Sequence, residues 1–486
     1  MIIYFTGNSY KYEIEAVMKL FLPLERFRFV YDSDKFEQGD ICIVSRNDNC
    51  LEVSVIFNGL SASKTQKQDN LSDELNLCRL LWLCMRELTG LTPPWGCLTG
   101  IRPVKKVNAM LNNGLGKEEV FRALKDDYFV SNEKAELAYQ TALAQAEKLK
   151  KIEEQAFSLY ISIPFCPSRC TYCSFVSHSI ENNSAKRLIS EYLDKLCTEI
   201  EKTAALSEEL ALYPESIYIG GGTPTSLSAE NLDFLMKKVK KSFNLSKIRE
   251  YTVEAGRPDT ITDEKLAVIK ENGAERISVN PQTLHDGVLR AIGREHSAKD
   301  FEKAYLLARE AGFDNINADI IAGLPTDTLD GFKNTVDTVA ELSPESITVH
   351  TLTVKRASAL FYEKAAVGAY SAEVVPQMVL YGQESLKRRG YIPYYLYRQK
   401  NALNNLENIG YSKKGFESLY NIYIMEEVQT ILAVGAAAST KLFEPCSNRI
   451  KRVLNCKYPY EYISRFDARI SEKESKIRDF YRKKLI

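Results

Sequence analysis

The sequence lacks the features of membrane and secreted proteins. It contains no run of about 18 apolar residues, which argues against a membrane-spanning helix. Its first residues, MIIYFTG, have neither the basic start nor the cleavage site of a signal peptide. The cysteine count of 11 is odd, and the cysteines outside residues 166–173 show no disulfide-like spacing. We therefore expect a cytoplasmic protein with reduced thiols and no membrane span.

An excess of charge of either sign is also missing. The chain has 64 lysine and arginine residues and 64 aspartate and glutamate residues. No global charge attracts it to nucleic acid or to an anionic membrane, so we expect no nucleic acid partner and predict its partners from individual sites. The length of 486 residues allows a large core and predicts two or three domains.

One short loop carries Cys166, Cys170 and Cys173 in C-x3-C-x2-C spacing, directly after a strand-like stretch. Three thiolates in one loop can hold a [4Fe-4S] cluster and leave one iron open for chemistry. Two other interpretations stay open. One is a structural zinc site, for which His178 is the nearby fourth ligand, and the other is a redox pair of Cys170 and Cys173. Spacing and context favour the cluster, with these three cysteines as its ligands. We call residues 166–173 the cysteine loop.

From residue 159 onward, strand-like and helix-like stretches alternate. Six such units predict a parallel sheet with helices packed against it, in an α/β fold. Periodicity alone does not distinguish a curved, incomplete barrel from an open sheet. The predicted strands are residues 159–164, 215–220, 250–255, 276–281, 315–322 and 346–352, and the predicted helices are 188–204, 232–241, 264–272, 301–311 and 329–342.

Unusual polar and glycine residues gather where these strands end. Parallel α/β folds place their active sites at the carboxyl ends of the strands, so one site explains all of these residues together. They are the cysteine loop, the glycine loop with its flank (GGGTPT, residues 220–225), Glu254, Gln282, Asp319, His350 and Thr351.

The string C-x3-C-x-Y-C at residues 166–173 resembles the signature of radical S-adenosylmethionine (SAM) enzymes. The longer string over residues 159–175 resembles the oxygen-independent coproporphyrinogen III oxidase family. The long N-terminal extension, with YRQK at 397–400 and NLEN at 405–408, resembles its HemZ-type subgroup of coproporphyrinogen dehydrogenases. This resemblance implies a partial (βα)6 radical-SAM barrel.

Three domains are predicted along the chain. Residues 1–155 read as an accessory domain, mixed α+β at first and helical from about residue 72. Residues 156–385 form the radical SAM core. Residues 386–486 form a Tyr-rich, mainly helical C-terminal region, and the resemblance implies that it helps to cover the substrate.

The resemblance also implies a set of SAM-binding residues. Glycine lets the backbone approach a ligand closely because it has no Cβ. Carboxylates accept hydrogen bonds from ribose hydroxyls or from the amine, and an arginine fork pairs with a carboxylate. The implied SAM residues are Tyr160, Gly221, Gly222, Thr223, Glu254, Gln282, Arg294 and Asp319.

The implied activity is that of a radical SAM oxidoreductase in porphyrin and haem biosynthesis. A reduced cluster cleaves SAM, and the resulting 5′-deoxyadenosyl radical removes a hydrogen from a propionate of coproporphyrinogen III. Loss of CO2 and of one further electron leaves a vinyl group, and two rounds give protoporphyrinogen IX. An electron donor such as flavodoxin or ferredoxin is implied as a partner. The abstraction needs no general acid or base, consistent with only four histidines.

A tetrapyrrole with four propionates needs cations on the rim of its cavity. Lys355 and Arg356, just beyond the sixth strand, and Arg398, at the end of an aromatic run, are the predicted substrate residues. The alternative is a solvated basic edge without a ligand.

Two positions depart from the pattern of the established oxidases. Ser162 stands where the family often has His, and Phe175 stands where the oxidases have a further Cys. The Phe version is shared with relatives that act on haem in other ways. A haem-binding chaperone and a radical methyltransferase acting on haem therefore stay open beside the decarboxylase.

Overall fold

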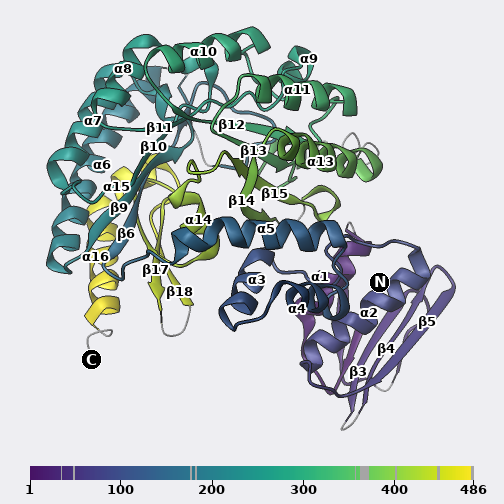
Figure 1. Ribbon diagram of the computed structural model, residues 1–486. Coiled ribbons are helices and arrows are strands. Elements are labelled where there is room, and N and C mark those ends of the chain that lie inside the picture. The colour runs from purple at the N-terminus through teal and green to yellow at the C-terminus, as the bar shows by residue number, and fades with distance from the viewer. Residues whose placement is uncertain are drawn as a thin grey trace. The chain divides into compact units, whose positions relative to one another are not determined.

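The computed structural model describes residues 1–23, 25–33, 35–47, 50–175, 178–180, 183–355, 357–361, 371–399, 402–445 and 449–482. The predicted substrate residue Arg356 lies outside these ranges. The chain divides into two compact units, Met1–Ala142 and Leu143–Ile486 (Figure 1). The domain boundaries at residues 155 and 385 stay predictions.

The first unit is built on a five-stranded sheet in the order β2-β1-β3-β4-β5. Helices α1 and α2 pack against this sheet, and their apolar residues join those of β1, β3 and β4 in one core. Strand β5 is absent from our prediction because its sequence, LSASKTQK, buries only Ala62 and shows no apolar periodicity. The elements are β1 (Ile2–Thr6), α1 (Lys11–Phe21), β2 (Arg28–Tyr31), β3 (Ile41–Asn47), β4 (Cys50–Phe57), β5 (Leu60–Lys67), α2 (Asp73–Thr89), α3 (Pro103–Asn112), α4 (Lys117–Arg122), the π-turn η1 (Ala123–Asp127) and α5 (Asn132–Leu149), whose last turns belong to the second unit.

The second unit contains the predicted parallel sheet. Its six strands pair in chain order, each parallel to the next, which confirms all six predicted strands. Their sequences are almost continuously buried, as strands covered on both faces require. The strands are β6 (Ala156–Ile163), β9 (Tyr213–Gly221), β10 (Glu250–Glu254), β11 (Arg276–Ser278), β12 (Asn315–Ala322) and β13 (Ser346–Thr351).

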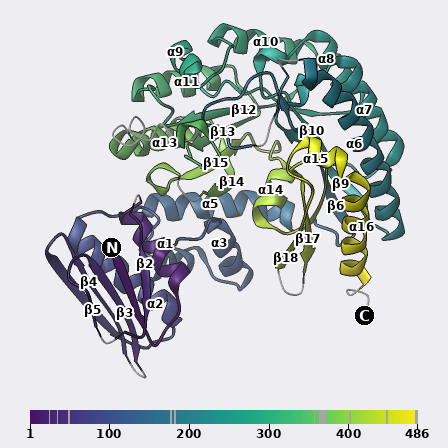
Figure 2. The same ribbon diagram turned by 180° about the vertical axis from the view of Figure 1, so that it is seen from behind.

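Helices form the outer layer of this partial (βα)6 barrel, and the strands lie inside it (Figures 1 and 2). Four of these helices begin at a Ser or Thr side chain that accepts a hydrogen bond from the third helical residue, the usual N-terminal cap. The helices are α6 (Asn183–Glu209), α7 (Ala229–Ser242), α8 (Asp263–Glu271), α9 (Asp286–Ala291), α10 (Ala298–Glu310), α11 (Leu329–Glu341) and α13 (Ser371–Arg388).

C-terminal segments extend the sheet at both ends. On one side β15 pairs antiparallel with β13 and then with β14, and on the other side β16 pairs parallel with β6 and is followed by β17 and β18. The region predicted as mainly helical thus holds strands as well as helices. Its elements are β14 (Ile392–Arg398), β15 (Glu407–Ser412), α14 (Leu419–Glu426), β16 (Thr430–Val434), β17 (Ser439–Glu444), β18 (Arg449–Leu454), α15 (Pro459–Ser464) and α16 (Phe466–Arg482).

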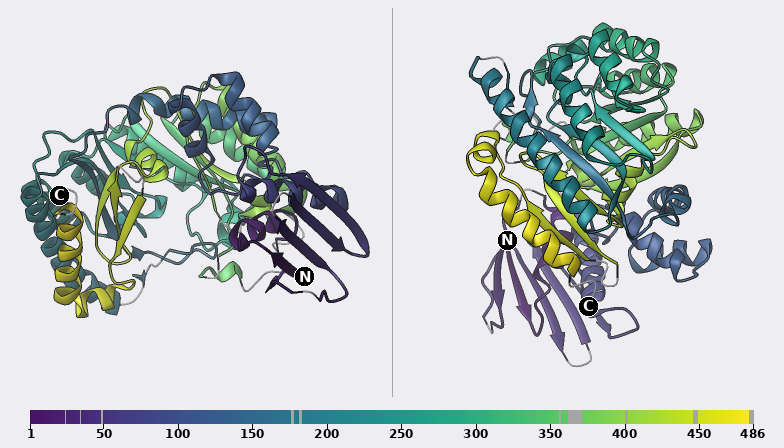
Figure 3. Two further views of the ribbon diagram at one scale, coloured as in Figure 1. Left: turned by 90° about the horizontal axis from the view of Figure 1, so that it is seen from below. Right: turned by 90° about the vertical axis from the view of Figure 1, so that its left-hand side faces the viewer.

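The last helix, α16, lies beside α6 (Figure 3). A buried ion pair joins the two helices, with Lys473 Nζ 2.7 Å from Glu199 Oε1. The other oxygen of Glu199 accepts hydrogen bonds from Tyr462 at 2.6 Å and from the backbone of Gly435 at 2.8 Å. The Glu199 carboxylate therefore fixes α15, α16 and the loop after β16 to α6. Among the described helices, none is long and apolar enough to cross a membrane.

Candidate active site

The cysteine loop follows β6 and is held by the loop after α9. The backbone N–H of Thr171 donates to the carbonyl of Ile292 at 3.0 Å, and Ser168 Oγ donates to the carbonyl of Gly293 at 3.3 Å. Within the loop, the N–H of Cys173 donates to the carbonyl of Cys170 at 3.1 Å. These bonds fix the loop at the carboxyl end of the sheet.

The three predicted cluster ligands lie close enough to influence one another. Burial raises the pKa of the Cys173 thiol to about 11, and the neighbouring thiolates of Cys170 and Cys166 contribute to the rise. Cys170 is buried, and the other two sulfurs are half-buried. The sequence spacing therefore places all three thiols in one locality.

The glycine loop (residues 220–222) packs directly on the cysteine loop. Gly222 N–H donates to the carbonyl of Ile163 at 2.8 Å, and Thr223 N–H donates to that of Phe165 at 2.7 Å. A Cβ atom on Gly222 would lie 2.5 Å from Phe165 O and 3.0 Å from Cys166 Sγ, so no larger residue fits. The structure thus brings Gly222 and Thr223 together with Cys166.

Glu254 lies at the end of β10 beside the glycine loop. One of its oxygens accepts a hydrogen bond from Tyr218 Oη, and the other accepts from the backbone N–H of Gly221 at 3.3 Å. Burial is the main cause that raises the pKa of Glu254 to about 7, with a contribution from the nearby Asp319 carboxylate, whereas the Tyr218 hydrogen bond opposes the rise. This carboxyl therefore titrates near neutral pH.

Gln282 follows β11 and lies beside Asp319 of β12. Gln282 has a left-handed backbone with φ of +66°, and its N–H donates to the Asp319 carbonyl at 2.9 Å. Its side-chain Oε1 is buried without a hydrogen-bond partner. Such an unusual backbone and an unpaired acceptor are typical of ligand-binding positions.

Asp319 is held by two side chains. Asn317 Nδ2 donates to its Oδ1 at 2.8 Å, and His350 Nε2 lies 3.7 Å from its Oδ2. Burial acts to raise the pKa of Asp319, but His350 and Asn317 together keep that pKa below its ordinary value. The carboxylate is therefore ionised inside the barrel and ready to accept hydrogen bonds.

Arg294 is buried beneath the cysteine loop. Its Nη1 donates to the carbonyls of Asn280 at 2.9 Å and Gly256 at 3.2 Å, and its Nη2 donates to Tyr172 Oη at 3.3 Å. Its Nε is buried without a partner. Most of the guanidinium is engaged by the protein, so its pairing with the SAM carboxylate stays a prediction.

The Tyr160 ring stacks with Tyr218 at 6.2 Å and with Tyr420 at 6.1 Å between ring centroids. The Tyr160 ring therefore belongs to an aromatic layer close to Glu254, whose charge acts on the Tyr160 hydroxyl.

The described substrate candidates differ in their environments. Lys355 is half-buried, burial lowers the pKa of its ammonium, and the Cys173 thiolate acts on it. Arg398 is 6 % exposed at the end of β14, where its Nε donates to Asn405 O at 3.2 Å and burial lowers its pKa to about 10. This burial excludes the alternative of a solvated edge for Arg398, and its role in binding the substrate stays a prediction.

Arg257 is a further residue of the site that our sequence reasoning missed. Its Nη1 lies 3.7 Å from Cys170 Sγ and 3.1 Å from Ser168 Oγ, and the side chain is buried. The available signal was the string Arg-Pro-Asp, which begins three residues after Glu254 at the end of a predicted strand.

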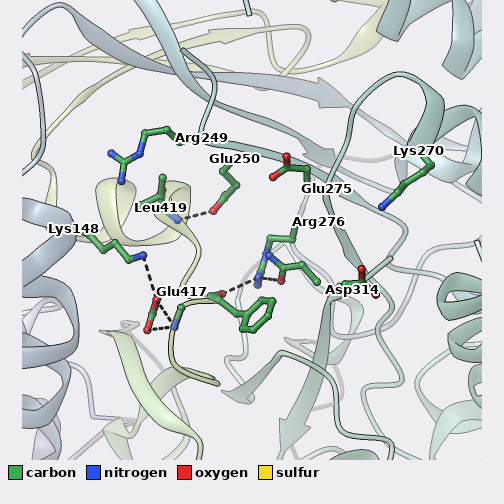
Figure 4. A pocket seen from close by; sticks show the side chains of 12 residues that line it. Lys148, Arg249, Glu250, Lys270, Glu275, Arg276, Asp314, Glu417 and Leu419 are labelled. Carbon is green, nitrogen blue, oxygen red and sulfur yellow. Dashed lines mark hydrogen bonds and ion pairs between the residues drawn. The ribbon is translucent and has the colours of Figure 1, made fainter. Parts of the chain in front are cut away.

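A pocket of about 440 Å³ lies at the opposite, amino-terminal ends of β10, β11 and β12 (Figure 4). Its charged side chains mainly form hydrogen bonds and ion pairs with other residues of the protein. Lys148 lies 3.4 Å from Glu417, Arg276 donates to Asn315 at 2.8 Å, and Glu250 accepts from the first backbone N–H of α14 at 2.6 Å. We therefore interpret this pocket as a structural feature of the amino-terminal end of the barrel.

The residues at the carboxyl edge fit a [4Fe-4S] cluster and SAM. Three thiols lie together, the glycine loop leaves room beside Cys166, and Gln282 and Arg294 offer an unpaired acceptor and donor. Within the described ranges, no three His, Cys, Asp or Glu side chains are placed to hold a single metal ion, whereas each thiolate of a cluster binds its own iron. His178 packs edge-on against Tyr460 at 6.1 Å.

The fold and this site define a radical SAM protein. The profile of the Radical SAM superfamily matches residues 160–339. The chain is 42 % identical over 399 residues to the oxygen-independent coproporphyrinogen-III oxidase-like protein HemZ of Bacillus subtilis (strain 168), covering 81 % of this chain and 79 % of that protein. It is 40 % identical over 199 residues to the heme chaperone HemW of the same organism, covering 41 % of this chain and 51 % of HemW.

A solved structure supports the same fold. Coproporphyrinogen III oxidase (HemN) from Escherichia coli aligns with a TM-score of 0.52 and 23 % sequence identity, over 68 % of this chain and 73 % of that chain. The chain belongs to the HemZ-type family of oxygen-independent coproporphyrinogen-III oxidase-like proteins, within the radical SAM superfamily. Its cofactors are a [4Fe-4S] cluster and SAM.

Proposed function

We propose that this protein is a radical SAM oxidoreductase that converts coproporphyrinogen III to protoporphyrinogen IX without oxygen, in haem biosynthesis. The observation that carries the proposal is the close packing of the glycine loop on the cysteine loop. Thr223 Oγ1 lies 3.5 Å from Cys166 Sγ, so a ligand of the glycine loop would lie next to the open iron. The similarity to the HemZ protein supports the choice of substrate.

Each step of the proposed chemistry is assigned to residues of the chain. Cys166, Cys170 and Cys173 would hold the cluster, leaving one iron for SAM. When bound, the two cofactors supply one-electron chemistry that removes a hydrogen atom from an unactivated carbon. The surrounding protein orients SAM and excludes water.

The SAM-binding roles are those that the family resemblance implies, and the hydrogen-bonding groups of these residues support them. Backbone groups at Gly221 and Gly222 approach the methionine part, and Thr223 adds a hydroxyl. Glu254 and Asp319 accept hydrogen bonds from ribose hydroxyls or the amine. The remaining assigned residues are Tyr160, Gln282 and Arg294.

Two described cations would bind the propionates of the tetrapyrrole. Lys355 follows β13 and lies near Cys173, and Arg398 ends β14. Because β13 and β14 both pair antiparallel with β15, their carboxyl ends lie at the same edge of the sheet. Flavodoxin or ferredoxin is the proposed class of electron donor.

The proposal is tested with anaerobically reconstituted protein, a reductant, SAM and coproporphyrinogen III, with protoporphyrinogen and 5′-deoxyadenosine measured together by chromatography. Both products should form, and both should be lost in Cys170→Ala. Cys50→Ala, a half-buried cysteine of the first unit, should retain both. Deoxyadenosine without porphyrin product would refute the decarboxylase and retain the radical chemistry.

A second candidate is haem binding, which the similarity to the heme chaperone HemW favours. Three of the four histidines are poorly placed to bind haem: His296 is buried, His285 caps α9, and His350 faces Asp319. His178 is the half-buried histidine beside the cysteine loop. Haem titration followed by the Soret band, compared with His178→Ala, tests this candidate. Release of S-adenosylhomocysteine in the same assay would indicate a haem methyltransferase instead.

A further inference from the structure

A buried arginine lies against the cysteine loop on the side of β10. Arg257 follows that strand, just before the 3-10 turn η3 (Pro258–Thr260), and only 3 % of it is exposed. Its Nη1 donates to Ser168 Oγ at 3.1 Å and lies 3.7 Å from Cys170 Sγ. The cation therefore contacts one of the proposed cluster ligands directly.

Asp259 fixes the orientation of this guanidinium. Arg257 Nε donates to Asp259 Oδ1 at 2.9 Å, and Nη2 donates to Oδ2 at 2.8 Å, a bidentate pair. The pair holds one edge of the guanidinium, so Nη1 is directed toward the cysteine loop. His296 Nδ1 lies 3.9 Å from the same carboxylate, and burial lowers the pKa of His296 to about 4, so this histidine is neutral.

A cation in this position acts differently on the two oxidation states of a cluster. The reduced cluster carries one more negative charge than the oxidised cluster. A hydrogen bond to a ligand sulfur and a nearby positive charge both stabilise the reduced state, and burial strengthens the effect because little water screens it. Outer residues of this kind tune a metal centre without binding the metal.

We propose that Arg257 is a positioning residue that raises the reduction potential of the [4Fe-4S] cluster through its contact with Cys170, with Asp259 holding it in place. The proposal rests on the assignment of Cys166, Cys170 and Cys173 as cluster ligands. A higher reduction potential would let an electron donor of moderate reducing strength reduce the cluster before SAM is cleaved.

The test is a redox titration of the reconstituted full-length protein, with the reduced cluster followed by EPR and iron content measured in parallel. Arg257→Gln should lower the midpoint potential enough to change the oxidised-to-reduced ratio at a fixed potential by at least tenfold, about 59 mV for one electron. Arg257→Lys keeps the charge without the fork and should fall between Arg257→Gln and wild type.

Asp259→Asn gives a prediction of opposite sign. The Asn side-chain oxygen still accepts a hydrogen bond from Arg257 Nε, so the guanidinium stays in place, and loss of the negative charge should raise the midpoint potential. Loss of packing alone does not produce shifts of opposite sign in two neighbours. The matched control is Arg249→Gln, which removes a cation paired with Glu215 at the other end of β10 and should leave the potential unchanged.

Each outcome tests either the tuning role of Arg257 or the assignment of the cluster ligands. A full cluster with wild-type potential in Arg257→Gln would overturn the tuning role and leave the proposed decarboxylation untouched. If Arg257→Gln does not retain a cluster, Asp259→Asn decides, because an unchanged or lowered potential there overturns the role. A wild-type protein without any cluster would overturn both the role and the assignment of the ligands.

Discussion

Thr223 Oγ1 donates to Cys166 Sγ at 3.5 Å, joining the loop after β9 to the loop after β6. These two loops carry the proposed SAM and cluster residues. Because neighbouring parallel strands deliver both loops to one edge of the sheet, the contact follows from the topology. Any change that separates the loops should affect cluster and SAM binding together.

Gly222→Ala tests this contact. The added Cβ would lie 2.5 Å from Phe165 O, a backbone atom that must move, so we expect most of the bound iron to be lost and stability to fall by about 1–3 kcal/mol. Iron per chain and urea unfolding measure the two effects. Gly100→Ala is the control, since a Cβ there meets nothing within 4 Å. Full iron content in Gly222→Ala would contradict the packing of the two loops.

Glu254 predicts a pH dependence of SAM binding. Its pKa is about 7, so about one tenth of the carboxyl is ionised at pH 6 and about nine tenths at pH 8. If the carboxylate accepts hydrogen bonds from SAM, affinity for SAM should rise about tenfold between these pH values. Equilibrium binding to the reconstituted protein measures this rise.

Two variants test whether Glu254 is the group that titrates. Glu254→Gln should bind SAM weakly and without this pH dependence. Tyr218→Phe removes a hydrogen bond that lowers the pKa of Glu254, so the midpoint of the pH dependence should move upward. An unshifted midpoint in Tyr218→Phe would assign the titration to another group.

Lys473→Met tests the buried ion pair with Glu199. The substitution leaves a fully buried carboxylate without its cation, which costs about 3–5 kcal/mol of the free energy of unfolding. Urea unfolding measures the loss. Lys476→Met removes a cation of the same helix that pairs with exposed Glu472 and should cause no measurable change. Equal stability of the two variants would show that the remaining donors, Tyr462, Gly435 and Asn455, suffice to hold Glu199.

Sequence alone predicts the parallel core well because its strands are continuous apolar runs that end in polar residues. The same logic singles out Glu254 and Gln282, at or just after the end of a buried strand, and Asp319, a charged residue inside one; their SAM roles stay predictions. It misses β5, whose side chains are mostly polar, and the burial of Arg398. It also misses Arg257, because an arginine after a strand is ordinary until its distance to Cys170 is known.

Lys355→Ala tests whether the proposed cations bind the substrate. Lys355 is chosen first because its side chain is more exposed than that of Arg398. Loss of one ammonium that pairs with a propionate should raise the KM for coproporphyrinogen III about tenfold and leave kcat within about twofold, because the contact is made equally in the ground and transition states. Lys270→Ala, at the amino-terminal end of the barrel, is the control and should leave KM unchanged.

Arg398→Ala should raise KM as well, but it also empties a buried position, so its stability is measured first. An unchanged KM in both variants would show that the propionates bind elsewhere. A raised KM in Lys355→Ala alone would place the substrate beside the cysteine loop and leave Arg398 as a support of β14.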